Sequence, residues 1–152
     1  MEKDGKSSGD FLVVCFLLGE SSFGVDASVV QEIVPVGKLT IVHDAPADVI
    51  GIRNLRGQIV TVIDMAARLG LSRADLCSEG RLLILKDRGE LYGFLVDTVT
   101  EAVELNERQI TTPPANRALS PSLRSQLLGV WQAGDKLSVL LDSDKLFQGF
   151  NE

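Results

Sequence analysis

Two aspartates in similar surroundings are the residues whose spacing suggests acid–base chemistry. Asp64 and Asp142 each follow an apolar run, at 59–63 and 137–141. Two carboxylates held on related strands can share a proton and act as a general acid and base. However, an aspartate between a strand and a helical segment is also a preferred helix N-cap, and the Asp-Ser/Thr-Gly pattern of aspartic proteases is absent. We therefore expect helix caps here and keep an aspartate-dyad enzyme as an alternative.

Other residue patterns that support catalysis or metal binding are missing from the sequence. His43 is the single histidine, so a site with two imidazole ligands is excluded. No phosphate-binding loop and no serine-nucleophile motif occurs. Cys15 lies in an apolar run and Cys77 in a polar one, which indicates a buried thiol and a loop thiol. The residues thus predict no catalytic activity, no cofactor and no metal.

An arginine at the turn of an apolar hairpin is the strongest candidate for a binding contact. The stretch 49–64 is apolar on both sides of a polar turn at 54–57, which predicts a β-hairpin. The run 59–63 is β-branched throughout, so we expect both faces of this strand to be buried. An exposed Leu55-Arg56 pair on the turn would then offer a contact surface. The alternative is that Arg56 pairs with a carboxylate and pins two lobes of the fold together.

The chain contains two similar blocks. Adding 78 to positions 49–64 aligns Gly51 with Gly129 and Asp64 with Asp142 without a gap, and adding 69 aligns the segments just upstream. This recurrence predicts two related β-subdomains.

The repeat also separates residues that the fold requires from residues specific to one copy. Gly134 stands at the position of Arg56, so the fold does not need an arginine at this turn. Glu32 has the counterpart Glu101, which favours a structural charge that protects an edge strand, although a contact with a partner stays open.

Short strands and tight turns account for most of the chain, which favours small barrels or a sandwich. We predict a mainly β fold with short helical segments that follow Asp64, Ser120 and Asp142. The expected organisation is a flexible tail at 1–10, a domain at 11–147 with a hinge near 72–80, and a C-terminal end at 148–152.

Bulk composition narrows the partners and the location. The net charge is −6, which argues against nucleic acid or an anionic membrane as the main partner. No apolar run reaches the length of a membrane span, and the polar N-terminus does not look like a secretory signal. We expect a cytoplasmic protein.

Several motifs together resemble the CheW-type family of chemotaxis coupling proteins. The resemblance covers nearly the whole chain, from about Phe11 to Phe147. The matching motifs are Val49-Ile50-Gly51-Ile52-Arg53-Asn54-Leu55-Arg56-Gly57, Val60-Thr61-Val62-Ile63-Asp64-Met65, Arg68-Leu69-Gly70-Leu71, Val30-Gln31-Glu32-Ile33, Phe94-Leu95-Val96-Asp97 with Val99-Thr100-Glu101, and the Pro113-Pro114 loop.

This resemblance implies two pseudo-repeated SH3-like β-barrel subdomains and no catalytic activity. It further implies an adaptor that couples the cytoplasmic tip of methyl-accepting chemotaxis receptors to the regulatory domain of a CheA-type histidine kinase. Carried over to this sequence, Arg56 and Glu32 are the receptor-binding candidates, and Asn54, Leu55 and Gly57 shape the turn. The residues that contact the kinase stay unassigned.

Two departures and one alternative accompany the resemblance. The family commonly has proline at the position of Thr61 and a small or apolar residue at that of Arg53. Arg53 beside Arg56 would make the turn more basic and tune it to its partner. A CheW-like adaptor of a non-flagellar pathway, such as twitching motility or second-messenger control, is the alternative function.

Overall fold

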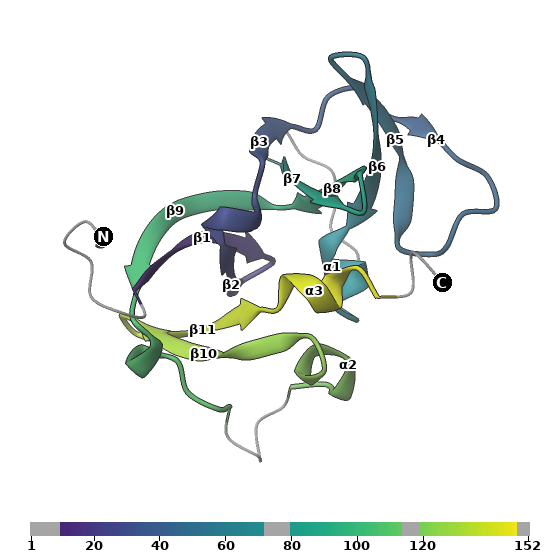
Figure 1. Cartoon of the computed structure of the whole chain (residues 1–152). Helices are drawn as coiled ribbons and strands as arrows, with labels where there is room; N and C mark the ends of the chain where they lie inside the picture. Colours follow the sequence, from purple (N-terminus) through teal and green to yellow (C-terminus); the bar gives the residue numbers. More distant parts are fainter. Residues whose placement is uncertain (1–9, 72–79, 114–118, 149–152) are drawn as a thin grey trace.

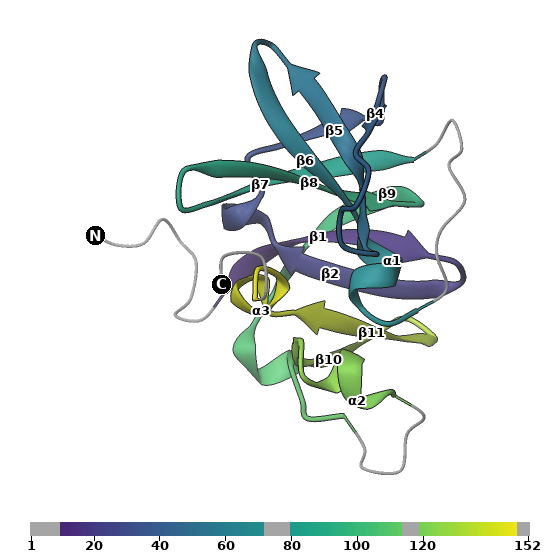
Figure 2. The ribbon, with the colours of Figure 1, turned by 90° about the vertical axis from the view of Figure 1, so that its right-hand side faces the viewer.

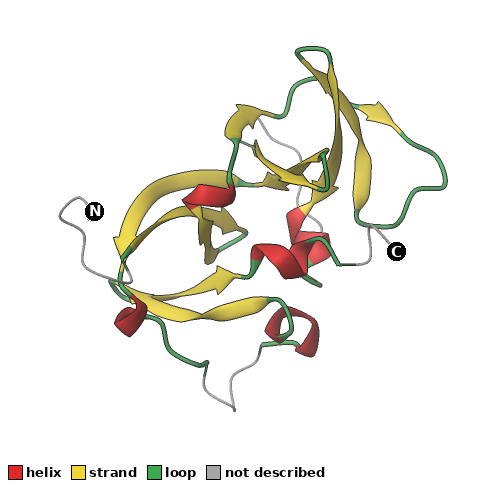
Figure 3. Ribbon diagram, in the orientation of Figure 1, coloured by secondary structure: helices red, strands yellow, loops and turns green. Residues whose placement is uncertain are grey.

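The computed structural model describes residues 10–71, 80–113 and 119–148. The predicted hinge and the predicted terminal segments lie almost wholly outside these ranges. Figures 1 and 3 show short strands joined by tight turns and one-turn helices. In chain order the elements are β1 (Phe11–Leu18), β2 (Ser21–Asp26), the 3₁₀ turn η1 (Ala27–Val29), β3 (Glu32–Pro35), β4 (Thr40–Ile41), β5 (Val49–Leu55), β6 (Gln58–Asp64), α1 (Met65–Arg68), β7 (Arg81–Asp87), β8 (Glu90–Val96), β9 (Thr98–Leu105), η2 (Glu107–Gln109), α2 (Pro121–Arg124), β10 (Leu127–Ala133), β11 (Lys136–Leu141) and α3 (Ser143–Leu146).

The strands form two sheets in the described residues. We call the five-stranded sheet β10-β11-β2-β1-β9, with the side chains it encloses, lobe A; the six-stranded sheet β3-β7-β8-β6-β5-β4 and its interior form lobe B. The prediction of a mainly β fold is confirmed. Neither sheet closes into a barrel through strand pairing in the described part of the chain.

The two lobes repeat one architecture. Strands β5 and β10 are 78 positions apart, and so are the helices α1 and α3 that follow each hairpin. The parallel pairing of β6 with β8 in lobe B matches the parallel pairing of β11 with β2 in lobe A. Each lobe combines a hairpin from one half of the chain with strands from the other half, since hairpin β7–β8 pairs with β3 and β6 in lobe B, and hairpin β1–β2 pairs with β9 and β11 in lobe A.

Three apolar clusters hold these sheets. The largest fills the space between the lobes and includes Phe23, Phe94 and Leu146. Each sheet also curves around a smaller cluster of its own, which includes Val62 in lobe B and Trp131 in lobe A. Helices α1 and α3 lie between the two sheets (Figure 1), so the junction of the lobes is part of the core.

Strand β6 corrects one prediction about burial. Val60, Val62 and Ile63 are fully buried, but Ile59 is 55% exposed. Both faces of the strand are covered only where β6 enters the junction between the lobes. Beyond it, hairpin β5–β6 projects away from lobe A, as Figure 2 shows. No helix in the described residues is long and apolar enough to cross a membrane.

Candidate functional site

The tip of hairpin β5–β6 is a two-residue turn made by Arg56 and Gly57. Both residues have positive φ angles, 50° and 87°, as a type I′ turn requires. The Asn54 Oδ1 atom accepts a hydrogen bond from the Gly57 amide at 2.9 Å. Asn54 and Gly57 therefore fix the turn, and Arg56 stands at its outer end.

Arg56 pairs with Glu32, which is the other predicted receptor-side residue. The Nη2 atom of Arg56 donates to Oε1 of Glu32. Glu32 begins β3, an end strand that β7 and β8 separate from β6 in the sheet order, so the curvature of lobe B brings β3 to the hairpin tip here. The two side chains stay 66% and 36% exposed. An exposed pair of this kind contributes about 0–1 kcal/mol to folding, and it leaves both charges accessible to a partner.

The turn of the second copy shows what the fold needs at this point. Gly134 occupies the position of Arg56 and also has a positive φ angle, 64°. A left-handed backbone costs a side-chain-bearing residue roughly 1 kcal/mol relative to glycine. The fold therefore does not require an arginine side chain at this turn.

Leu55 does not lie on the surface, so the predicted exposed Leu-Arg pair is wrong. It is only 7% exposed and packs with Val34 and Val60 inside lobe B. Successive side chains along a strand point to opposite faces, and at the end of β5 Leu55 points inward while Asn54 is exposed. The exposed apolar side chains of β3 and β6 are Ile33, 40% exposed, and Ile59.

Arg53 points away from the tip and does not make it more basic. Its Nη1 atom donates to the carbonyl oxygens of Pro35 and Val36, the latter at 3.3 Å. The guanidinium lies against Gly37, where a Cβ atom would approach the Arg53 Cζ atom to 2.8 Å. Arg53 therefore ties β5 to the end of β3 and the residue that follows it. This contact is structural, and its acceptors are backbone carbonyls.

Asp64 and Asp142 are the N-caps of α1 and α3, as predicted. Asp64 is fully buried and accepts hydrogen bonds from the amides of Ala66 and Ala67 at 3.1 and 3.3 Å. Asp142 accepts one from the Asp144 amide at 3.0 Å. Because both carboxylates serve helix termini, the geometry gives no support to a catalytic dyad.

A cavity of about 450 Å³ opens beside β2 and α2. Its wall includes Phe23, Leu123 and Val130, with Glu20 and Lys136 also lining it. No group of three or more metal-ligating side chains gathers in the residues 10–71, 80–113 and 119–148.

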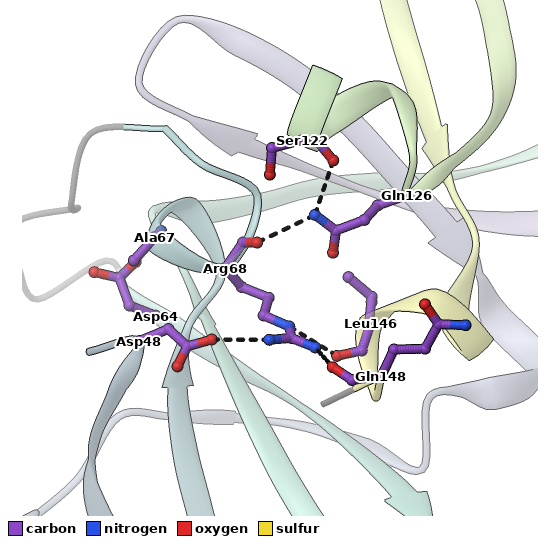
Figure 4. A network of polar contacts seen from close by, with 8 residues as sticks. All are labelled: Asp48, Asp64, Ala67, Arg68, Ser122, Gln126, Leu146 and Gln148. Carbon is purple, nitrogen blue, oxygen red and sulfur yellow. Dashed lines mark hydrogen bonds and ion pairs between the residues drawn. The ribbon is translucent and has the colours of Figure 1, made fainter. Parts of the chain in front are cut away.

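Sequence reasoning missed the contact that joins the two lobes. Arg68, at the end of α1, binds Asp48 and the carbonyl oxygens of Leu146 and Gln148 (Figure 4). The repeat could have indicated a special role for Arg68, because this arginine aligns with the apolar Leu146 in the second copy. The role that we considered for Arg56, pinning the two lobes, belongs to Arg68.

Comparisons with known proteins identify the family. The model of the CheW-like domain matches residues 12–150. A probable chemotaxis protein CheW of Rhizobium etli is 29% identical over 93% of this chain and 90% of its own length. The chemotaxis protein CheW of Treponema pallidum is 31% identical over 90% of this chain and 82% of its own length.

A solved structure has the same fold. The crystal structure of the scaffolding protein TtCheW from Thermoanaerobacter tengcongensis superposes with a TM-score of 0.84 at 26% identity, and the match covers 100% of this chain and 97% of that one. Sequence and structure agree over nearly the full length, and this chain belongs to the CheW-like family.

Proposed function

We propose that this chain is a non-catalytic cytoplasmic adaptor that couples methyl-accepting chemoreceptors to a CheA-type histidine kinase. The match of the CheW-like domain model to residues 12–150 carries this proposal. Relatives over most of the chain are named chemotaxis and scaffolding proteins, which gives it further support.

Arg56 and Glu32 are the proposed contacts with the receptor. A helical hairpin tip presents an apolar stripe edged by charged residues, and carboxylates on that edge suit a guanidinium fork. The exposed Ile33 follows Glu32 on β3, the exposed Ile59 lies near the start of β6 just after the turn of Arg56, and both suit the apolar stripe. Asn54 and Gly57 hold the turn, and Leu55 anchors it from inside lobe B.

The likeness to the scaffolding protein also supports the finer description of each lobe as an SH3-like barrel. In lobe B, side chains join hairpin β5–β6 to β3 across the curve of the sheet, with Arg53 on the carbonyls of Pro35 and Val36 and Arg56 on Glu32. Among the described strands β3 pairs with β7 alone, and its Glu32 contacts Arg56 at the proposed receptor site.

A binding comparison with a matched arginine tests the receptor site. Wild type, Arg56→Ala and Arg56→Glu are incubated with a receptor signalling fragment and, separately, with the kinase. Arg88→Ala is the control, because Arg88 has a positive φ angle of 53° and precedes Gly89 in the turn between β7 and β8 of the same lobe.

The proposal predicts that both Arg56 variants lose receptor binding while kinase binding and the melting temperature hold. The Arg88→Ala control retains both partners. If the Arg56 variants melt early and lose both partners, Arg56 is a structural residue and the proposed site is wrong. If wild type binds neither partner, the coupling function itself is wrong.

A further inference from the structure

The guanidinium of Arg68 joins three segments of the chain at the junction of the lobes. Its Nη1 atom lies 3.2 Å from Oδ2 of Asp48, just before β5. Its Nε atom donates to the carbonyl oxygen of Leu146 at 3.0 Å, and Nη2 donates to that of Gln148. Figure 4 shows the guanidinium lying between Asp48 and the C-terminal end of α3.

A return contact completes this network. Gln126, which precedes β10, donates through Nε2 to the carbonyl oxygen of Arg68 at 3.2 Å and to that of Ser122 at 3.1 Å. Segments of lobe B and of lobe A therefore hold each other in both directions. We call Arg68, Asp48, Gln126 and the carbonyls of Leu146 and Gln148 the clasp.

Burial makes the ion pair of the clasp sensitive to the loss of either partner. The side chains of Arg68 and Asp48 are only 17% and 15% exposed. Removing one member of a sheltered pair leaves the other charge poorly solvated, so the structure must shift to admit water. The shift that the fold permits most readily is a change in how the two lobes meet.

The repeat shows that the fold does not require the ion pair. The backbone contact at the base of the hairpin is the same in both copies, from the Asp64 amide to the Asp48 carbonyl at 2.8 Å and from the Asp142 amide to the Gln126 carbonyl at 2.9 Å. At the two side-chain positions, however, Gln126 replaces Asp48 and Leu146 replaces Arg68. Arg56 and Arg68, neither of which has a charged counterpart in the second copy, thus belong to hairpin β5–β6 and to the helix that follows it.

Their positions give the hairpin the geometry of a lever. The clasp grips its base, and Arg56 is at its tip. A seven-residue strand such as β6 spans about 23 Å at ~3.3 Å per residue. A rotation of about 10° at the base would therefore displace the tip by about 4 Å, more than a hydrogen bond tolerates.

We infer that Arg68 is a positioning residue that fixes the angle between the lobes and thereby sets where Arg56 meets the receptor. Arg68 contacts neither partner itself. Its guanidinium satisfies the carbonyl of Leu146, the last residue of α3, and that of Gln148 just beyond it, as a cation does at a helix C-terminus. The pair with Asp48 holds hairpin β5–β6 on that helix. The inference rests on the proposed function only for its effect on receptor binding.

Distances between the lobes in the free protein test the clasp without any partner. Spin labels are placed at Gln58→Cys and Lys136→Cys, two exposed positions that are repeat counterparts, in a Cys15→Ala and Cys77→Ser background. Double electron–electron resonance then gives the distribution of distances between the two labels in the protein that keeps Arg68 and in its Arg68→Gln and Arg68→Lys variants. Leu105→Ala, which empties part of the lobe A interior, is the control for general loss of stability.

Arg68→Gln should broaden or shift the distance distribution below its melting temperature, whereas Leu105→Ala leaves it unchanged. Arg68→Lys keeps the charge but loses the fork that reaches two carbonyls, so it should fall between wild type and Arg68→Gln. In receptor titrations, Arg68→Gln should weaken binding about tenfold with kinase binding unchanged.

An unchanged distance distribution in Arg68→Gln would show that the clasp does not fix the angle between the lobes, whatever the receptor affinity of this variant. A shifted distribution with unaltered receptor affinity would overturn the lever. If wild type itself does not bind the receptor fragment, the proposed function fails, and the distance measurement still decides the clasp.

Discussion

Hairpins β5–β6 and β10–β11 are two versions of one structure, and their differences separate folding from function. Both have a register shift at the same glycine, Gly51 or Gly129, and both end in an aspartate that caps a one-turn helix. They differ at the turn, where Arg56 replaces Gly134, and after the hairpin, where Arg68 replaces Leu146. The shared residues build the hairpin, and the residues found in one copy form the proposed site and its support.

The shared glycines should give the largest effects on stability. A Cβ atom at Gly51 would lie 2.3 Å from the carbonyl oxygen of Thr40, and one at Gly129 would lie 2.5 Å from Ile110 Cγ2 and 2.8 Å from the Thr111 carbonyl oxygen. We expect Gly51→Ala and Gly129→Ala each to cost about 3 kcal/mol in urea unfolding, because a neighbouring backbone cannot give way.

Gly57→Ala is the matched control for these substitutions. Gly57 has a positive φ angle but nothing within 4 Å of its Cβ position, so its replacement should cost only about 1 kcal/mol. Equal losses at Gly51 and Gly57 would contradict close packing as the reason for the shared glycine.

The two caps should differ because their burial differs. Asp64 is fully buried and accepts from two amides, whereas Asp142 is partly exposed and accepts from one. We expect Asp64→Ala to cost about 2 kcal/mol and Asp142→Ala about 1 kcal/mol in urea unfolding. A larger loss for Asp142→Ala would contradict the account of these residues as caps of unequal burial.

Cys15, whose counterpart in lobe B is Ile84, should give the smallest effect. Burial, and to a lesser extent the charge of Glu101, raises the pKa of its thiol from 9.0 to about 11. The folded protein therefore retains a proton that the unfolded chain releases, and stability is full below pH 9 and falls as the pH rises toward 11.

Comparison with Cys15→Val isolates the contribution of the thiol from that of the rest of the protein. The variant should lose less stability than wild type between pH 9 and pH 11 in urea unfolding, and the two should show the same pH dependence from pH 7 to 8. Parallel curves over the whole range would show that the thiol does not titrate as its burial requires.

Much of the fold could be predicted from the sequence because it depends on local signals. The offset of 78 residues, the turn glycines and the aspartates at strand ends predicted hairpins and caps that the structure contains. Burial along β5 and β6 could not be predicted, because a continuous β-branched run does not reveal where the cover of one face ends. In the structure Ile59 is exposed and Leu55 is buried, the opposite of what we expected for each.

The contacts of the arginines were harder to predict. Arg53 and Arg68 both bind backbone carbonyls, and a carbonyl leaves no mark in the sequence. The pair of Arg56 with Glu32 depends on the curvature of lobe B, which brings β3 to hairpin β5–β6 although β7 and β8 lie between them in the sheet order.

Arg56→Gly gives the hairpin tip of lobe B the residue that the other copy has, and it tests the central claim most directly. The receptor affinity and the free energy of unfolding are measured on the same preparation. Losing the exposed ion pair and relieving the left-handed arginine nearly cancel, so we predict a stability within about 1 kcal/mol of wild type. The affinity for the receptor fragment should fall about tenfold or more. An Arg56→Gly protein that binds the receptor as tightly as wild type would contradict the account.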